Sequence, residues 1–184
     1  DGHPVDQISR HSLRSSFGMV LQETWLKSGT IRENIAYGSP DASEEEIQRA
    51  LSIAQASGFV KSKPEGLNTM VSQGGANLSG GQRQRLTIAR ALVGDPEILI
   101  MDDSASALDF ATDAALRHAI HEQTKGMTVF IVSQRATSIK QADKILVLDD
   151  GELAGVGTHK ELMESCEVYR EICLSQLSEQ EVNR

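Results

Sequence analysis

A chain of 184 residues is long enough for one domain with a sizeable core, and this one carries a net charge of -8. That acidic balance argues against a general nucleic-acid surface or an anionic-membrane surface, because both need clustered basic charge. An apolar fraction of 39% fits a folded globular protein. No signal peptide is visible and no apolar run approaches the roughly 20 residues that span a bilayer, so we expect no direct membrane insertion by this segment.

The first half of the chain predicts one short strand followed by helices. Residues 17–21 form an apolar strand, and residues 30–37 have helical character. A second helix is expected to begin after Ser43, as its cap, and to continue up to Gly58. Residues 59–77 hold a proline and several glycines and predict a loop.

The second half alternates strands with helices. Residues 97–102 and 127–132 are continuous apolar runs, the form of strands buried on both faces, and a helix over residues 110–123 separates them. Shorter elements follow: a helical piece, strands at residues 144–148 and 152–156, and a helix from residue 159 to about 177. This alternation predicts an α/β fold with a mostly parallel sheet.

We expect three parts in the chain. Residues 1–23 and 95–165 form the α/β core, and residues 24–94 form an α-helical subdomain inserted into it. Residues 166–184 form a C-terminal helix and a polar tail.

The stretch Leu78-Ser79-Gly80-Gly81-Gln82 opens the last helix of the expected helical subdomain. Ser79 followed three residues later by Gln82 has the form of a capping box. Free amides, a hydroxyl and two residues without side chains let a phosphate approach the backbone and the positive end of the helix dipole. A glycine pair alone is equally consistent with a plain turn, so the neighbouring segments decide.

Two polar residues follow predicted strands. Asp102 ends an apolar strand, and ligands in open α/β sheets bind at that edge. A carboxylate there suits Mg²⁺ beside the phosphates of a nucleotide. Gln22 could coordinate the metal or orient a water. Taken alone, Asp102 is also consistent with a helix cap, and Gln22 with an ordinary surface residue.

Together these segments resemble the nucleotide-binding domain of ABC transporters, specifically of the exporter type, from Asp1 to about Gln176. Five motifs occur in the family's order: a Q-loop at Gln22, the signature sequence at Leu78, Ser79, Gly80, Gly81 and Gln82, a Walker B strand at residues 98–102, a D-loop at residues 106–109, and the switch position at Gln134. Residues 30–35, 142–145 and 157–162 are typical of exporters.

The resemblance implies a partial P-loop NTPase (RecA-like) core, with ATP and Mg²⁺ as cofactors. It also implies a head-to-tail dimer, in which each ATP lies between the Walker motifs of one chain and the signature of the other. The implied nucleotide contacts are Gln22, Leu78, Ser79, Gly80, Gly81, Gln82 and Asp109, with Asp102 and Gln22 as metal ligands and Asp103 and Gln134 at the catalytic positions. The implied partners are a second nucleotide-binding domain and the transmembrane domain of an exporter, at the cytoplasmic face of the cell membrane, and nucleic acid is not among them.

Several positions depart from the family's pattern. Residues 1–184 contain no glycine-rich loop ending in Gly-Lys-Ser/Thr, which in relatives precedes the Q-loop, so we expect a truncated piece that is inactive by itself. Asp103 stands where a glutamate base is usual, about 1.5 Å shorter in reach. Gln134 replaces the switch histidine and cannot take a proton. Residues 72–75 replace the Gly-Glu-Arg-Gly of exporters, in a loop that touches the membrane domain in relatives.

Two changes that serve one site predict a degenerate site, and thus the weakened half of a heterodimeric exporter. Its intact signature would complete the competent site of the partner. Two alternatives stay open: a soluble ABC ATPase of DNA repair or translation, and a regulatory module in which nucleotide occupancy matters and hydrolysis does not. The acidic charge and the exporter-type residues 30–35 count against the first alternative.

Overall fold

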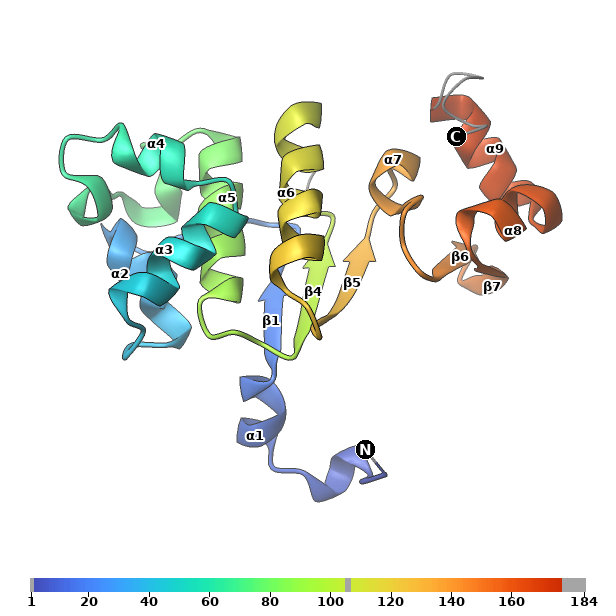
Figure 1. The fold of residues 1–184 in the computed structure, drawn as a ribbon, viewed down its shortest axis with the longest axis horizontal. Coiled ribbons are helices and arrows are strands. Elements are labelled where there is room, and N and C mark those ends of the chain that lie inside the picture. Colours follow the sequence, from blue (N-terminus) through green and yellow to red (C-terminus); the bar gives the residue numbers. More distant parts are fainter. Residues whose placement is uncertain (1, 105–106, 177–184) are drawn as a thin grey trace. The chain divides into compact units, whose positions relative to one another are not determined.

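A three-stranded parallel sheet forms the centre of the first part of the structure, a computed structural model that describes residues 2–104 and 107–176. Its strands are β1 (Phe17–Val20), β4 (Ile98–Asp102) and β5 (Thr128–Val132), in the order β1-β4-β5. Figure 1 shows them side by side and running in one direction. The expected α/β fold with a parallel sheet is therefore confirmed.

Contacts within the chain define two compact units, Asp1–Val132 and Ser133–Arg184. In the first unit, the segment between β1 and β4 carries the helices α2 (Ile31–Ile35), α3 (Glu44–Ile53), α4 (Ser57–Lys61) and α5 (Gly80–Leu92). Because β1 and β4 are neighbours in the sheet, this helical segment is an insertion between adjacent strands. The exact limits of a core and a helical subdomain stay a prediction.

Short elements complete the first unit. They are the 3-10 turns η1 (Val5–Gln7), η2 (Ala36–Gly38), η3 (Gly66–Asn68) and η4 (Gln73–Gly75), the helix α1 (Arg10–Ser15), and the antiparallel pair β2 (Gly29–Thr30) and β3 (Met70–Val71). The segment 24–94 is therefore almost, but not wholly, helical among its described elements.

Helices cover one face of the sheet. Leu99 of β4 lies in one hydrophobic cluster with Leu86 of α5 and with Leu116 of α6 (Phe110–Gln123), and all three are fully buried. On the opposite face, Met19 of β1 and Phe130 of β5 are 56% and 54% exposed. The expectation that β4 and β5 are buried on both faces is wrong, because side chains alternate along a strand and the described helices cover one side only.

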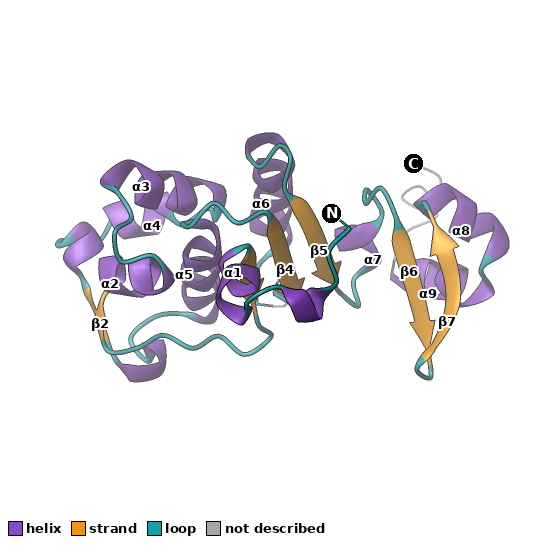
Figure 2. Ribbon diagram, turned by 90° about the horizontal axis from the view of Figure 1, so that it is seen from below, coloured by secondary structure: helices purple, strands orange, loops and turns teal. Residues whose placement is uncertain are grey.

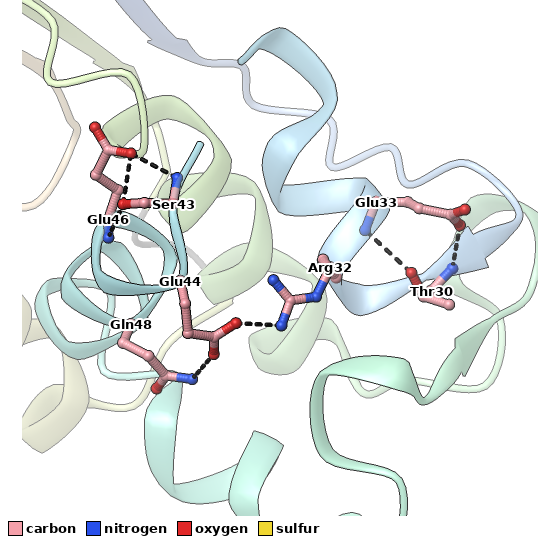
Figure 3. A network of polar contacts seen from close by, with 7 residues as sticks. All are labelled: Thr30, Arg32, Glu33, Ser43, Glu44, Glu46 and Gln48. Carbon is pink, nitrogen blue, oxygen red and sulfur yellow. Dashed lines mark hydrogen bonds and ion pairs between the residues drawn. The ribbon is translucent and has the colours of Figure 1, made fainter. Parts of the chain in front are cut away.

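The helices of the insertion begin with strong local caps. Thr30 and Ser43 each form a capping box, with Glu33 and Glu46 as the third residue of α2 and α3. Figure 3 shows both caps and the ion pair between Arg32 and Glu44 that joins the two helices. Gln48 donates a second hydrogen bond to the Glu44 carboxylate at 3.0 Å. The hydrogen bond from Gln48, and next in size the one from Arg32, lower the pKa of Glu44.

Helix α3 ends five residues earlier than expected. Gln55 takes a left-handed conformation with φ of 55°. The amide of Ala56 donates to the carbonyl of Leu51 at 2.8 Å, and the amide of Gln55 donates to that of Ser52 at 3.1 Å. This pair of bonds is a Schellman motif, which closes the helix and lets α4 begin at Ser57. The expected loop over residues 59–77 accordingly starts inside a helix.

The second unit contains α7 (Ala136–Ile139), an antiparallel hairpin of β6 (Ile145–Asp149) and β7 (Glu152–Gly157), then α8 (His159–Ser165) and α9 (Glu167–Gln176). Asp150 and Gly151 both have positive φ, which fits a tight hairpin turn. Figure 2 shows α8 and α9 beside the hairpin, and Tyr169 and Cys173 of α9 are buried with it. The expected single helix after residue 159 is broken at the extended residue Cys166.

Among the described residues, the structure has no helix long and apolar enough to cross a membrane.

Candidate functional site

The start of α5 has the capped geometry that its sequence predicts. The hydroxyl of Ser79 accepts a hydrogen bond from the amide of Gln82 at 3.3 Å, and the Gln82 side-chain oxygen accepts one from the amide of Ser79 at 3.1 Å. Gly80 and Gly81 are the first two helical residues. Amides at these positions have no acceptor within their own helix, so they remain as donors for an anion.

The two glycines of the signature lie close to the next loop, and the approach is tight at Gly81. A Cβ atom on Gly81 would lie 3.2 Å from the carbonyl oxygen of Ala107, and one on Gly80 would lie 3.8 Å from the Ala107 Cβ. The signature is thus packed against the predicted D-loop, of which Ser106 lies outside the described residues. Two donors without side chains at an exposed helix start fit a phosphate group by their chemistry.

Two arginine side chains stabilise this helix start through hydrogen bonds to backbone carbonyl oxygens. Arg83 donates to the carbonyl of Leu78 at 2.7 Å. Arg85 donates through Nε to the carbonyl of Gly81 at 3.1 Å and through Nη1 to that of Gln55 at 2.8 Å. Its guanidinium also lies over the ring of Phe59, 4.9 Å from the centroid. The sequence alone does not reveal that Arg85 supports this turn, because its partners lie as far as 30 residues away.

Asp109, an expected nucleotide contact, caps α6. Its two carboxylate oxygens accept from the amide and the hydroxyl of Thr112, at 2.9 and 2.8 Å. These bonds, the one from the backbone first, lower the pKa of Asp109. Nearby, partial burial lowers the pKa of the Arg85 guanidinium, and the Asp109 carboxylate opposes that shift. In this structure Asp109 therefore acts as the N-cap of α6.

The carboxyl ends of two neighbouring strands bring the expected metal-binding residues to one edge of the sheet. Val20 of β1 is in register with Met101 of β4, so Gln22, two residues after β1, and Asp102, the last residue of β4, lie at the ends of adjacent parallel strands. Asp102 is half-buried and Gln22 is exposed. Oxygen donors of this kind suit Mg²⁺, which binds few protein ligands and takes the rest from water and phosphate. No group of three His, Cys, Asp or Glu side chains in the described part of the chain could hold a metal alone.

Asp103 has a constrained backbone. Its φ is 41°, in the left-handed region, and its amide donates to the carbonyl of Val132 at 2.9 Å. Aspartate and asparagine adopt this region more readily than most residues. The residue type at position 103 therefore suits the local conformation.

Gln134 belongs to the second unit, and its side chain is exposed. The backbone around it is held by the end of α9. The side chain of Gln176 donates to the carbonyl of Gln134 at 2.8 Å and accepts from the amide of Ala136 at 2.9 Å. This contact joins residues 42 positions apart, and no local sequence signal reveals it.

Comparisons with known proteins show the family of the chain. A family profile described as ABC transporter matches residues 1–106, which is 106 of the 184 residues. In Bacillus subtilis, the uncharacterized ABC transporter ATP-binding protein YknU is 46% identical over 172 residues, which cover 94% of this chain and 29% of that protein. The probable multidrug resistance ABC transporter ATP-binding/permease protein YheI of the same organism is 47% identical, over 92% of this chain and 29% of its own length.

A solved structure gives the same result. The structure of a bacterial Atm1-family ABC exporter with ATP bound matches with a TM-score of 0.91 and 36% identity, over 97% of this chain and 31% of that chain. The chain thus spans about 30% of the length of the relatives that it matches. The likeness confirms a fold of the P-loop NTPase class. The chain belongs to the ABC transporter family, as an ATP-binding domain homologous to those of exporters.

Proposed function

We propose that this chain is the nucleotide-binding part of an ABC exporter, which couples the binding and hydrolysis of ATP to export across a membrane. The observation that carries the proposal is the capping box at Ser79 and Gln82, because it turns the amides of Gly80 and Gly81 into a preorganised anion site. The names of relatives support transport: YheI is described as a probable multidrug resistance ATP-binding/permease protein.

The signature acts on an ATP that is held mainly by a second nucleotide-binding domain. Ser79, Gly80 and Gly81 would therefore donate to the γ-phosphate of that ATP, where negative charge must be stabilised. The guanidinium groups of Arg83 and Arg85 would not contact the phosphate themselves, because they bind backbone carbonyl oxygens of this turn. The likeness to an ATP-bound exporter supports ATP as the ligand.

Each of this chain's two catalytic positions would carry a residue with weaker chemistry than the family's usual one. Asp103 has the correct charge for a base but a shorter reach, and losing a general base lowers rates by about 10²–10⁴-fold. Gln134 donates and accepts hydrogen bonds but cannot place a positive charge on a phosphate. Asp102 and Gln22 would hold Mg²⁺, which when bound neutralises phosphate charge. We infer that this domain is the degenerate half of a heterodimer.

The surface near residues 72–75 would meet the transmembrane domain. The amide of Gly74 donates to the carbonyl of Leu26 at 2.8 Å, which holds this loop beside the segment that follows the Q-loop. Trp25 and Met70 in the same region are exposed, as a contact with another protein surface requires. This contact would keep the domain at the cytoplasmic face of the membrane.

The test is ATP turnover of the assembled heterodimer. The double change Asp103→Glu and Gln134→His should raise turnover, because it restores a competent base and switch at the second site. Replacing the partner's base should abolish most of the turnover of the unmodified heterodimer. The proposal is wrong if the double change has no effect and the partner's base is also dispensable. ATP binding with no turnover in any of these proteins would instead favour the regulatory module.

A further inference from the structure

The amide group of Gln176 bridges two backbone groups on either side of Arg135. It donates to the carbonyl of Gln134 at 2.8 Å and accepts from the amide of Ala136 at 2.9 Å. Arg135 is extended, with φ of -95° and ψ of 114°. Extended backbone points the carbonyl of the preceding residue and the amide of the following residue to one side, so one side-chain amide can bind both.

This bridge replaces a missing helix cap. Ala136 is the first residue of α7, and the preceding Arg135 provides no side-chain cap for that helix. The amide of a first helical residue has no acceptor within its helix. Gln176 supplies that acceptor, and its second bond fixes the carbonyl of the switch residue.

The helix that carries Gln176 is packed into the core of its unit. It lies one turn after Cys173 on α9, and Cys173 and Tyr169 are both fully buried in the core of this unit. The hydroxyl of Tyr169 is 2.9 Å from Nδ1 of His159, which joins α9 to the start of α8. The last described turn of α9 is therefore anchored by packing, and the segment that it holds runs from the exposed residue Gln134 to Ala136, the fully buried first residue of α7.

We propose that Gln176 is a positioning residue for Gln134: through these two bonds the end of α9 fixes the backbone of residues 134–136, and with it the direction in which the Gln134 side chain leaves the chain. The functional part of this proposal rests on the proposed role of position 134. The structural part does not, because it concerns contacts within residues 133–176 alone.

The first test uses the 184-residue chain without nucleotide. Hydrogen exchange of the Ala136 amide should be about fivefold faster or more in Gln176→Ala, which loses a bond of ordinary strength. The order parameters of the amides of residues 134–136 should fall below the value of about 0.85 of rigid backbone. Gln176→Glu keeps the acceptor and loses the donor, so it should free the Gln134 carbonyl while partly protecting Ala136.

Ser175→Ala is the matched control, because among residues 2–104 and 107–176 the Ser175 hydroxyl bonds only to the carbonyl of Ile172 in its own helix. It should leave exchange at Ala136 and the order parameters unchanged. Equal exchange in Gln176→Ala and in the unmodified chain would overturn the proposal. So would an equal loss of protection in Ser175→Ala, because it would mean that α9 is merely unfolding.

The second test uses the assembled exporter in the background of Gln134→His and Asp103→Glu. There, Gln176→Ala should lower kcat by about tenfold with KM for ATP unchanged, because small misplacements of a reacting group reduce rates strongly. An unchanged kcat alongside faster exchange would overturn the positioning role. If the background itself gains no turnover and the partner's base is also dispensable, the proposed function fails, and the order parameters at residues 134–136 still decide whether Gln176 positions them.

Discussion

The amide of Asp103 donates a hydrogen bond to the carbonyl oxygen of Val132 across 2.9 Å, and Asp103 takes a φ of 41° in making it. The residue in the position of the catalytic base is thus tied to the end of the neighbouring strand in a conformation that disfavours most side chains. The choice of residue at position 103 is therefore constrained by the backbone conformation as well as by the chemistry of a base.

The first prediction concerns this conformation. Asp103→Ala should be less stable to unfolding than Asp103→Gly by about 1 kcal/mol, because glycine has no Cβ to strain at positive φ. Both changes remove the carboxylate, so the difference isolates the backbone effect. Urea denaturation of the two variants measures it. An alanine variant as stable as the glycine variant would mean that position 103 carries no strain.

The second prediction concerns the helix cap of the signature. Ser79→Ala should lower the free energy of unfolding by about 1 kcal/mol, since it removes the acceptor for the Gln82 amide. Ser79→Asp should retain most of the stability, because aspartate is as good a cap. The comparison is made by urea denaturation of the three proteins. Equal loss in both variants would show that the Ser79 hydroxyl does not cap α5.

The third prediction concerns Arg85. Arg85→Lys keeps the charge but cannot bind the carbonyls of Gly81 and Gln55 together, so it should cost about 1–3 kcal/mol of stability. Arg49→Lys is the control: Arg49 also binds two groups, the Asp95 carboxylate and the carbonyl of Gln123, but it does so at an exposed position, so the change should cost less than about 1 kcal/mol. Thermal unfolding of both variants checks this, and an equal cost would contradict the role assigned to Arg85.

The fourth prediction concerns acid pH. Hydrogen bonds from Thr112 lower the pKa of Asp109 in the folded chain. Since the unfolded chain then binds the proton more readily, the contribution of Asp109 is present above the ordinary pKa of about 4 and is lost as the pH falls below it. Asp109→Asn retains a good cap and does not titrate, so its melting temperature should fall less between pH 5 and pH 2. Parallel curves for the two proteins would contradict this.

The features that the sequence predicts correctly are those that depend on neighbouring residues in the chain. The helix over residues 110–123 has the predicted limits, and the start of α5 follows from Ser79 and Gln82, three residues apart. The end of α3 is different, because its left-handed residue is Gln55 and not the glycine that would mark it. The burial of β5 depends on what covers each face of the sheet, and a run of apolar residues carries no information about that.

The candidate site also has a part that the sequence predicts and a part that it does not. The signature is a run of adjacent residues, so its geometry could be predicted from sequence alone. The residues that support it could not, because Arg85 reaches Gln55 across 30 positions and Gln176 reaches Gln134 across 42. Such contacts arise from tertiary packing, and no periodic pattern in a single sequence predicts them.

The central claim is that this chain supplies its signature to the ATP site of a partner. ATP turnover of the assembled exporter carrying Ser79→Asp in this chain tests it most directly, because the change keeps the helix cap and places a negative charge where the γ-phosphate would bind. We predict that turnover falls by about 10²-fold or more while the melting temperature is unchanged. Turnover that stays above half of its original value would contradict the claim.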